Sequence, residues 1–173
     1  MKSECPEEVR DYADQTVKYV ENAMEQTLSY DSETLPLLDF YLKSIPTDEL
    51  AVVNLTAATV GAYFGEVVRR TLGGHWQENI GPDPMEWRLI LPGGLTFIPS
   101  AMALCCMTKE DGDLVVDAPP KMMVHIKDAL ERMTDLSEEA FFSLAGRYDT
   151  LEHLQEVLLA IASHLASDKK IRN

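Results

Sequence analysis

The stretch from Thr47 to Trp76 constrains the fold more than any other part of the chain, because it carries both ends of one long helix. Thr47 can cap the first turn with its hydroxyl, and the two acids after it place negative charge where the helix dipole is positive. Two arginines fall in the last turn, and Gly73-Gly74 supplies a stop. These signals predict a helix over residues 48–72.

The interior of this helix is apolar on more than one side, which is typical of a helix buried within a domain. The apolar residues are Leu50, Val52, Val53, Leu55, Val60, Phe64, Val67, Val68 and Leu72. Polar residues interrupt them and charges flank them, so we expect no membrane span. Gly61 and Gly65 lie in a strip of small residues at helical spacing. The strip predicts close packing of another segment, which we favour over a helix dimer through the two glycines.

Two runs in this half of the chain resemble a family of uncharacterised bacterial proteins. The first is GAYFGEVVRRTLGGHW over residues 61–76, and the second is Tyr30-Asp31-Ser32 followed by LPLLDFYL over residues 35–42. Together they cover less than half of the chain. The resemblance implies a bacterial origin and no particular activity.

The length of 173 residues suits one domain with its own core. We expect one globular domain over 1–173, made of a helical N-terminal part (1–46), the central helix and sheet (47–118), C-terminal helices (119–168) and a frayed tail (169–173). The formal charge is −14, with −8 in residues 1–50, −1 in 51–104 and −5 in the rest. Such a surface disfavours nucleic-acid binding and suits a basic protein partner, although solvated helix faces are the commoner reason for it.

The N-terminus lacks the pattern of a secretory signal, and the three cysteines form no disulfide framework. Both observations predict a soluble protein of the reducing cytoplasm.

Helical periodicity predicts an amphipathic helix over 6–29 and a shorter one over 34–44, with Pro36 in its first turn. After the central helix the period changes to that of strands. Residues 75–80 predict a short strand, and alternation from Glu86 to Leu91 predicts one arm of a hairpin over 86–98 that turns at Pro92-Gly93-Gly94. We therefore expect an α+β fold, mostly helical, in which the central helix packs on a small antiparallel sheet between N- and C-terminal amphipathic helices.

The last third of the chain reads as helices. We predict a short helix over 101–107, a polar turn over 109–113, a strand over 114–116 and a helix over 119–134. Ser137 can cap a further helix that Gly146 breaks or bends. From Thr150 an apolar stripe predicts an amphipathic helix; its members are Leu151, Leu154, Val157, Leu158, Ile161 and Leu165.

Chemistry-bearing motifs do not stand out. No two of the four histidines have metal-ligand spacing, and the adjacent Cys105 and Cys106 lack the two-residue spacer of redox pairs. A nucleophile elbow, a Walker loop and a dinucleotide fingerprint are all missing from the sequence. The sequence therefore predicts neither a metal nor a cofactor, and it favours a protein that is not an enzyme.

Our preferred hypothesis is a non-enzymatic protein-interaction module, such as an adaptor, a chaperone-like protein or an immunity-like protein. The alternative is an enzyme or small-ligand binder with a cleft between the central helix and the sheet. The candidate binding residues for that cleft are Glu66, Arg69, Arg70, His75, Trp76 and Arg88. For Glu66 and Arg70, an ordinary ion pair on the helix surface is the favoured interpretation. A homodimer through the glycines or the terminal helices is compatible with either function.

Overall fold

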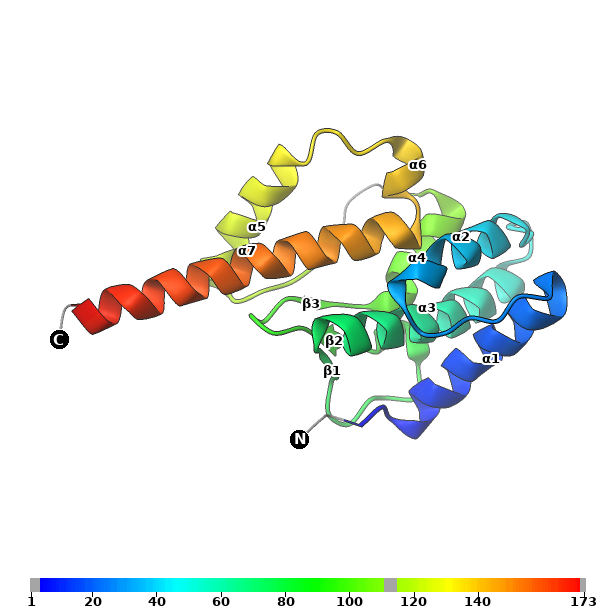
Figure 1. Ribbon diagram of the computed structural model, residues 1–173. Coiled ribbons are helices and arrows are strands. Elements are labelled where there is room, and N and C mark those ends of the chain that lie inside the picture. Colours follow the sequence, from blue (N-terminus) through cyan, green and yellow to red (C-terminus); the bar gives the residue numbers. More distant parts are fainter. Residues whose placement is uncertain (1–3, 111–114, 172–173) are drawn as a thin grey trace.

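The computed structural model describes residues 4–110 and 115–171. It is mostly helical with one small antiparallel sheet, so the predicted α+β class is confirmed. Figure 1 shows the long helix α3 (Leu50–Leu72) at the centre, with α1 (Glu7–Met24) beside it and α4 (Pro99–Thr108) packed on it.

The first two helices are close to the prediction, with one correction. Helix α1 ends at Met24 because Glu25 adopts a left-handed conformation with φ 54°, so the predicted extent to residue 29 is wrong. A 3-10 turn (Ser32–Thr34) then leads into α2 (Leu35–Lys43). Pro36 lies in the first turn of α2, as predicted, where it removes no helical hydrogen bond.

Helix α3 ends as predicted and begins differently. Gly73, with φ 83°, closes it by donating its N–H to the Arg69 carbonyl at 3.0 Å. Its first residue follows Glu49, and no side chain caps it, so the predicted Thr47 cap is wrong. Every residue from Ala57 to Val68 is buried. Among the described helices α3 alone is long and apolar enough to cross a membrane, and 72% of its most apolar window is buried inside the protein.

The glycines of α3 let other segments approach its backbone. A Cβ at Gly61 would lie 2.4 Å from the Ser100 Cα in α4, and one at Gly65 would lie 2.3 Å from the Trp76 ring. The predicted internal packing is confirmed. Because these neighbours already cover both glycines, the geometry favours internal packing over a dimer through them, and the homodimer stays a prediction.

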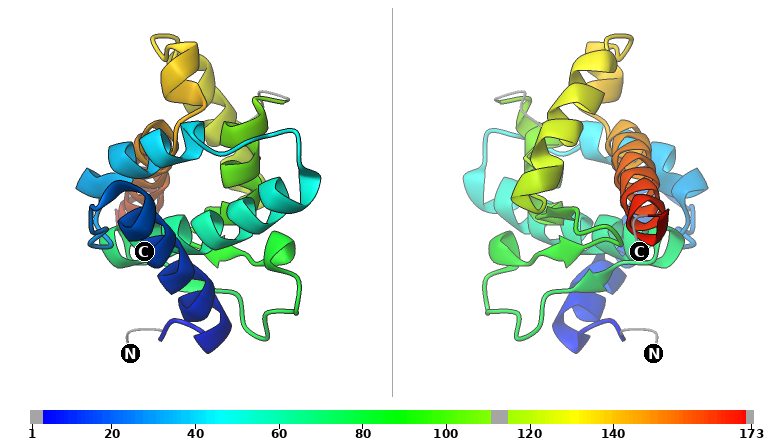
Figure 2. Two further views of the ribbon diagram at one scale, coloured as in Figure 1. Left: turned by 90° about the vertical axis from the view of Figure 1, so that its right-hand side faces the viewer. Right: turned by 90° about the vertical axis from the view of Figure 1, so that its left-hand side faces the viewer.

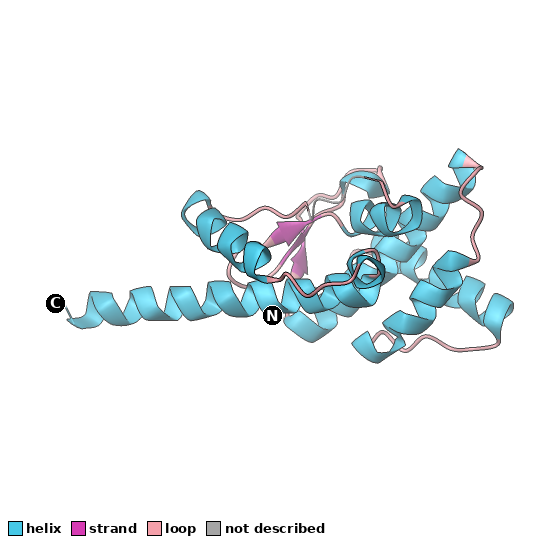
Figure 3. Ribbon diagram, turned by 90° about the horizontal axis from the view of Figure 1, so that it is seen from above, coloured by secondary structure: helices cyan, strands magenta, loops and turns pink. Residues whose placement is uncertain are grey.

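The sheet has the order β1-β2-β3, and its strands β1 (His75–Trp76), β2 (Leu89–Ile90) and β3 (Thr96–Phe97) pair antiparallel with their neighbours. Figure 3 shows the strands in magenta. The register pairs Trp76 with Leu89 and Leu89 with Phe97. The hairpin, the burial of Trp87, Leu89 and Leu91, and the turn at Gly93 and Gly94 (φ 91° and 87°) are confirmed. The predicted extent of its first arm is wrong, because β2 covers only Leu89–Ile90 and Glu86 ends a 3-10 turn (Pro84–Glu86). The first strand is shorter than the predicted 75–80.

The region after α4 falls partly outside the described residues, which include neither Leu114 nor most of the predicted polar turn. A single antiparallel bridge between Thr96 and Asp117 stands near the predicted strand over 114–116. Helix α5 (Pro120–Arg132) matches its prediction, and the Ser137 hydroxyl caps α6 (Glu138–Phe141) by accepting from the Ala140 N–H.

Helix α7 (Leu144–Ile171) contains the largest correction. The predicted break at Gly146 is wrong, because Gly146 lies in the first turn of this helix. A Cβ there would lie 1.9 Å from the Ala140 carbonyl oxygen, so the position serves close packing against the end of α6. The helix also continues through residues 169–171, where we predicted a frayed tail.

The core is one hydrophobic cluster to which helices α1 to α5, α7 and the sheet all contribute. The views along α7 in Figure 2 show it between α2 and α5, both of which it contacts. Its C-terminal turns extend beyond the rest of the molecule (Figures 1 and 3).

Candidate functional site

Four of the six candidate residues meet around the carboxylate of Glu66. Oε1 accepts from Arg69 Nε and from Trp76 Nε1, each at 2.7 Å. Oε2 accepts from Arg69 Nη2 at 3.0 Å and from Arg70 Nε at 3.2 Å. The predicted Glu66–Arg70 pair is confirmed, but its predicted place on the helix surface is wrong, because Glu66 is only 1% exposed.

This geometry holds Glu66 as an anion. Burial by itself raises the pKa of a carboxyl group, but the hydrogen bonds from Arg69 and Trp76 outweigh burial and lower the pKa of Glu66 below its usual 4.5. These four hydrogen bonds, together with one from Cys5, fill the acceptor capacity of the carboxylate. The hydrogen bond from Trp76 attaches strand β1 to helix α3. Because its oxygens are already occupied, Glu66 is unsuited to act as a general base or to bind a ligand.

The cluster also reaches α1. The Arg70 guanidinium stacks 4.0 Å above the ring of Tyr30, whose hydroxyl donates to Asp14 at 2.7 Å. The Tyr30 N–H donates to the Tyr63 hydroxyl at 3.0 Å. Burial, and then the bond to Asp14, raise the pKa of Tyr30. These contacts connect α1, the loop after it and α3.

A cysteine borders the same cluster. Burial and the negative charge of Glu66 raise the pKa of Cys5 to about 12. The thiol donates to the Pro6 carbonyl at 3.4 Å. Because a thiolate is the reactive form, Cys5 is a poor nucleophile at neutral pH.

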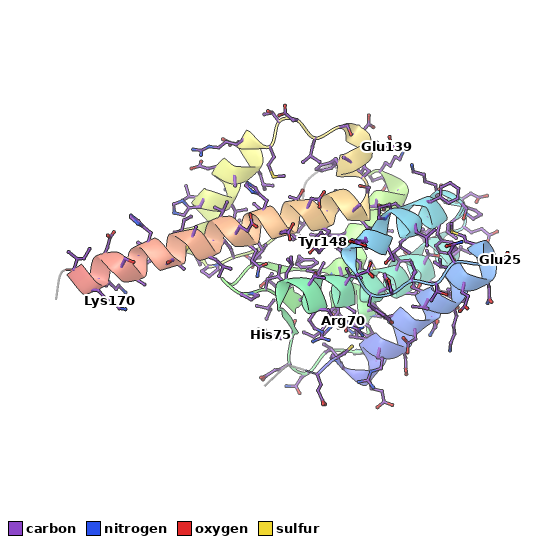
Figure 4. The ribbon with its side chains drawn as sticks, viewed as in Figure 1. Glu25, Arg70, His75, Glu139, Tyr148 and Lys170 are labelled. Carbon is purple, nitrogen blue, oxygen red and sulfur yellow. The ribbon has the colours of Figure 1, made fainter. Side chains whose placement is uncertain are left out.

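The other two candidates lie elsewhere. His75 is exposed in the edge strand β1, and Arg88 is exposed just before β2 (Figure 4 labels His75 and Arg70). The Arg88 backbone carbonyl accepts from the Gln77 N–H at 2.9 Å. None of the six candidates lines either of the two hollows described next, so these hollows give the predicted cleft no support.

The larger hollow has a volume of about 910 Å³ and lies among α2, the end of α4 and α6. Asp39 and the exposed Phe40 come from α2, and Phe142 comes from the other side. The Asp39 carboxylate caps α7 by accepting from the N–H groups of Leu144 at 2.7 Å and Ala145 at 3.1 Å. Burial nevertheless raises the pKa of Asp39. This carboxylate is therefore committed to holding α7.

The smaller hollow, of about 180 Å³, contains a residue that the sequence interpretation missed. Arg147, in the first turns of α7, lines it together with residues of α4 and is only 3% exposed. Its guanidinium stacks 4.1 Å from the Phe141 ring, and Nη2 donates to Cys105 Sγ at 3.5 Å. Burial raises the pKa of the neighbouring Cys106 to about 12, although Arg147 opposes this shift.

A signal for Arg147 does exist in the sequence. The apolar stripe of α7, extended backward from Leu158 through Leu154 and Leu151, passes through positions 147 and 148. A charged residue at a core position is the observation that would have identified it. Placing the helix start at Thr150 hid that position.

Among the described residues, no group of three or more histidine, cysteine or acidic side chains is arranged to hold a metal ion. Comparison of the chain with protein-family models, with curated proteins and with solved structures gave no match. The resemblance to the bacterial family stays a prediction, and function rests on the geometry.

Proposed function

We propose that this protein acts without catalysis as a protein-interaction module, and that it binds its partner through the projecting end of α7, residues 159–171. The observation that carries the proposal is the continuation of the buried face of α7 into solvent. Leu151, Leu154 and Leu158 are fully buried on that face. About two turns beyond Leu158, on the same face, Leu165 is 51% exposed.

The turn of the β2–β3 hairpin lies against α7 at the point where its projecting end begins. The site of a Cβ on Gly93 lies 3.3 Å from Leu158 and 3.7 Å from Leu159. Beyond this contact, every residue from 162 to 171 is exposed. Figure 1 shows this end of α7 projecting from the other elements. Leu159 (44% exposed) and Ile171 (83% exposed) are further exposed apolar residues, each about 120° around the helix from Leu165. An amphipathic helix with an uncovered apolar face is a common docking element for a partner helix.

Charge indicates the kind of partner. The chain carries a net charge of −14, so two copies repel each other and a basic protein is attracted. Asp149 and Glu156 lie on the exposed side of α7 and lead up to the projecting end. Lys169 and Lys170 stand at its tip (Figure 4 labels Lys170). The occupant we propose is an amphipathic helix on a basic protein, with its basic end directed toward the body.

The test is site-specific photo-crosslinking in the native host, with the photoreactive residue at the exposed Ala166 and, as a control position, at the exposed Asn22 of α1. The same bait is made with Leu165→Ser and with the matched control Val124→Ser, since Val124 is an equally exposed apolar residue on α5. Sedimentation of each purified variant reports self-association.

We expect one basic protein to cross-link from position 166 and not from position 22. Its association should weaken as salt rises, be lost in Leu165→Ser and persist in Val124→Ser. Two results would contradict the proposal. One is cross-linking of the partner that Leu165→Ser leaves unchanged, and the other is a stable homodimer that Leu165→Ser dissociates. The second result would assign the projecting end to another copy of this chain.

A further inference from the structure

Arg147 is a buried cation without a counter-ion in the part of the chain that the structure describes. No described carboxylate lies within ion-pair distance of it, and its Nε has no hydrogen-bond partner. An arginine side chain stays charged and carries five N–H donors. Its hydrogen-bond acceptors among the described residues are the sulfurs of Cys105, at 3.5 Å, and Cys106, and sulfur is a weak acceptor. A charge in this position is normally paired.

The guanidinium is also held in place. Phe141 covers one of its faces at 4.1 Å, and Cys105 Sγ accepts from Nη2. The side chain is therefore fixed in orientation before any ligand arrives, which reduces the entropy lost on binding.

The hollow beside Arg147 has mostly apolar walls. Ala101, Met102 and Leu104 of α4 contribute to them, and Thr108 adds a hydroxyl. Its volume of about 180 Å³ equals that of roughly six water molecules in the liquid. The exposed Glu110 also lines it, and among the described residues no lysine or second arginine does.

We propose that this hollow binds a small monocarboxylate with a short apolar tail, and that the carboxylate pairs with Arg147. A planar carboxylate matches the guanidinium fork, and the apolar walls accommodate the tail. One cation near an acidic residue suits a single negative charge better than the two charges of a phosphate. This inference is independent of the docking role of α7.

The test is titration calorimetry of the purified protein with hexanoate, which has eight non-hydrogen atoms, and with the neutral isostere hexanamide. Inorganic phosphate is the third probe. Arg147→Met keeps the side-chain volume and the contact with Phe141 while removing the charge. Ala101→Leu fills the hollow and leaves Arg147 in place. Circular dichroism confirms that each variant is folded.

We expect hexanoate to bind and hexanamide to bind at least tenfold more weakly. Arg147→Met and Ala101→Leu should each weaken hexanoate binding at least tenfold, whereas Glu110→Gln should strengthen it by removing a like charge. The proposal is overturned if hexanoate shows no binding at millimolar concentration, if the amide binds equally well, or if Arg147→Met leaves the affinity unchanged. Binding of phosphate in preference to hexanoate would also overturn it.

Discussion

At the scale of single residues, the two buried charged side chains in the described ranges, Glu66 and Arg147, have opposite surroundings. Glu66 accepts from Arg69, Arg70 and Trp76, and its acceptor capacity is satisfied. Arg147 has a sulfur atom and an aromatic ring. A satisfied ion cluster stabilises a fold locally, whereas a buried cation without an anion is a place where a ligand adds what the chain lacks.

The state of Glu66 gives a prediction about pH. Its pKa is lowered on folding, so its stabilising contribution is present above the ordinary value of 4.5 and is lost as the pH falls through the lower pKa of the folded state. Glu66→Gln should reduce the free energy of unfolding by about 2–3 kcal/mol at pH 7, less than for a fully buried pair because Arg70 is partly exposed. The difference between the variant and wild type should shrink below pH 4.5.

Urea denaturation of both proteins between pH 3 and pH 7 measures this difference. Glu78→Gln, at an exposed acid, is the control and should change stability by less than about 0.5 kcal/mol throughout. A Glu66→Gln effect that stays constant over the whole range would contradict a lowered pKa.

At the scale of elements, α4 can pack closely against α3 because Gly61 has no side chain at the point of contact. In an isolated helix, Gly→Ala adds about 1 kcal/mol of helix propensity. Here the added Cβ would lie 2.4 Å from the Ser100 Cα and 2.5 Å from the Ser100 backbone nitrogen, so α4 would have to move. We expect Gly61→Ala to destabilise the protein by about 2–3 kcal/mol, as overpacking does.

Thermal unfolding followed by circular dichroism measures this effect. The matched control is Gly81→Ala, because no atom lies within 4 Å of a Cβ built there and the substitution should be neutral or slightly stabilising. If Gly61→Ala were as stable as wild type, the close approach of α3 and α4 would be wrong.

The elements that the sequence predicted well are those whose signals are local. Gly73 ends α3, and alternation places Trp87, Leu89 and Leu91 on the buried face of the hairpin. The start of α7 escaped prediction because its cap, Asp39, lies 105 residues earlier in the chain than Leu144. Of the candidate site, the sequence found the Glu66–Arg70 pair, but burial of Glu66 depends on Trp76 and on tertiary packing that no local pattern reports.

At the scale of the whole molecule, Asp39 joins α2 to the first turn of α7, which lies 105 residues later in the chain. Asp39→Ala removes the acceptor for two N–H groups and should cost about 1–3 kcal/mol. Asp39→Asn keeps one acceptor oxygen and should cost less.

The pKa of Asp39 shifts upward on folding, so ionising this carboxyl costs stability as the pH rises through the window just above 3.8. Guanidinium denaturation at pH 7 compares wild type with the two variants. Equal losses for Asp39→Ala and Asp39→Asn would show that the oxygen at this position does not cap α7.

The projecting end of α7 contributes to the outline of the molecule and little to its core. Because residues 163–171 are all exposed, a chain that stops after Ala162 loses no buried side chain of the hydrophobic cluster. We expect this truncation to change the free energy of unfolding by less than about 1 kcal/mol, as is usual for exposed residues. Helical circular dichroism should fall only by the share of the removed turns.

Chemical denaturation of the truncated and full-length chains measures the difference, and Leu158→Ala, which removes a fully buried side chain from the same helix, provides the contrast at about 2–5 kcal/mol. A truncation as damaging as Leu158→Ala would mean that residues 163–171 pack on the body, and the docking role of α7 would lose its basis. If the truncation leaves the free energy of unfolding unchanged, the effects on folding and on binding can be separated. Loss of partner binding by the truncated chain would then be due to the removed surface, because the remaining structure is intact.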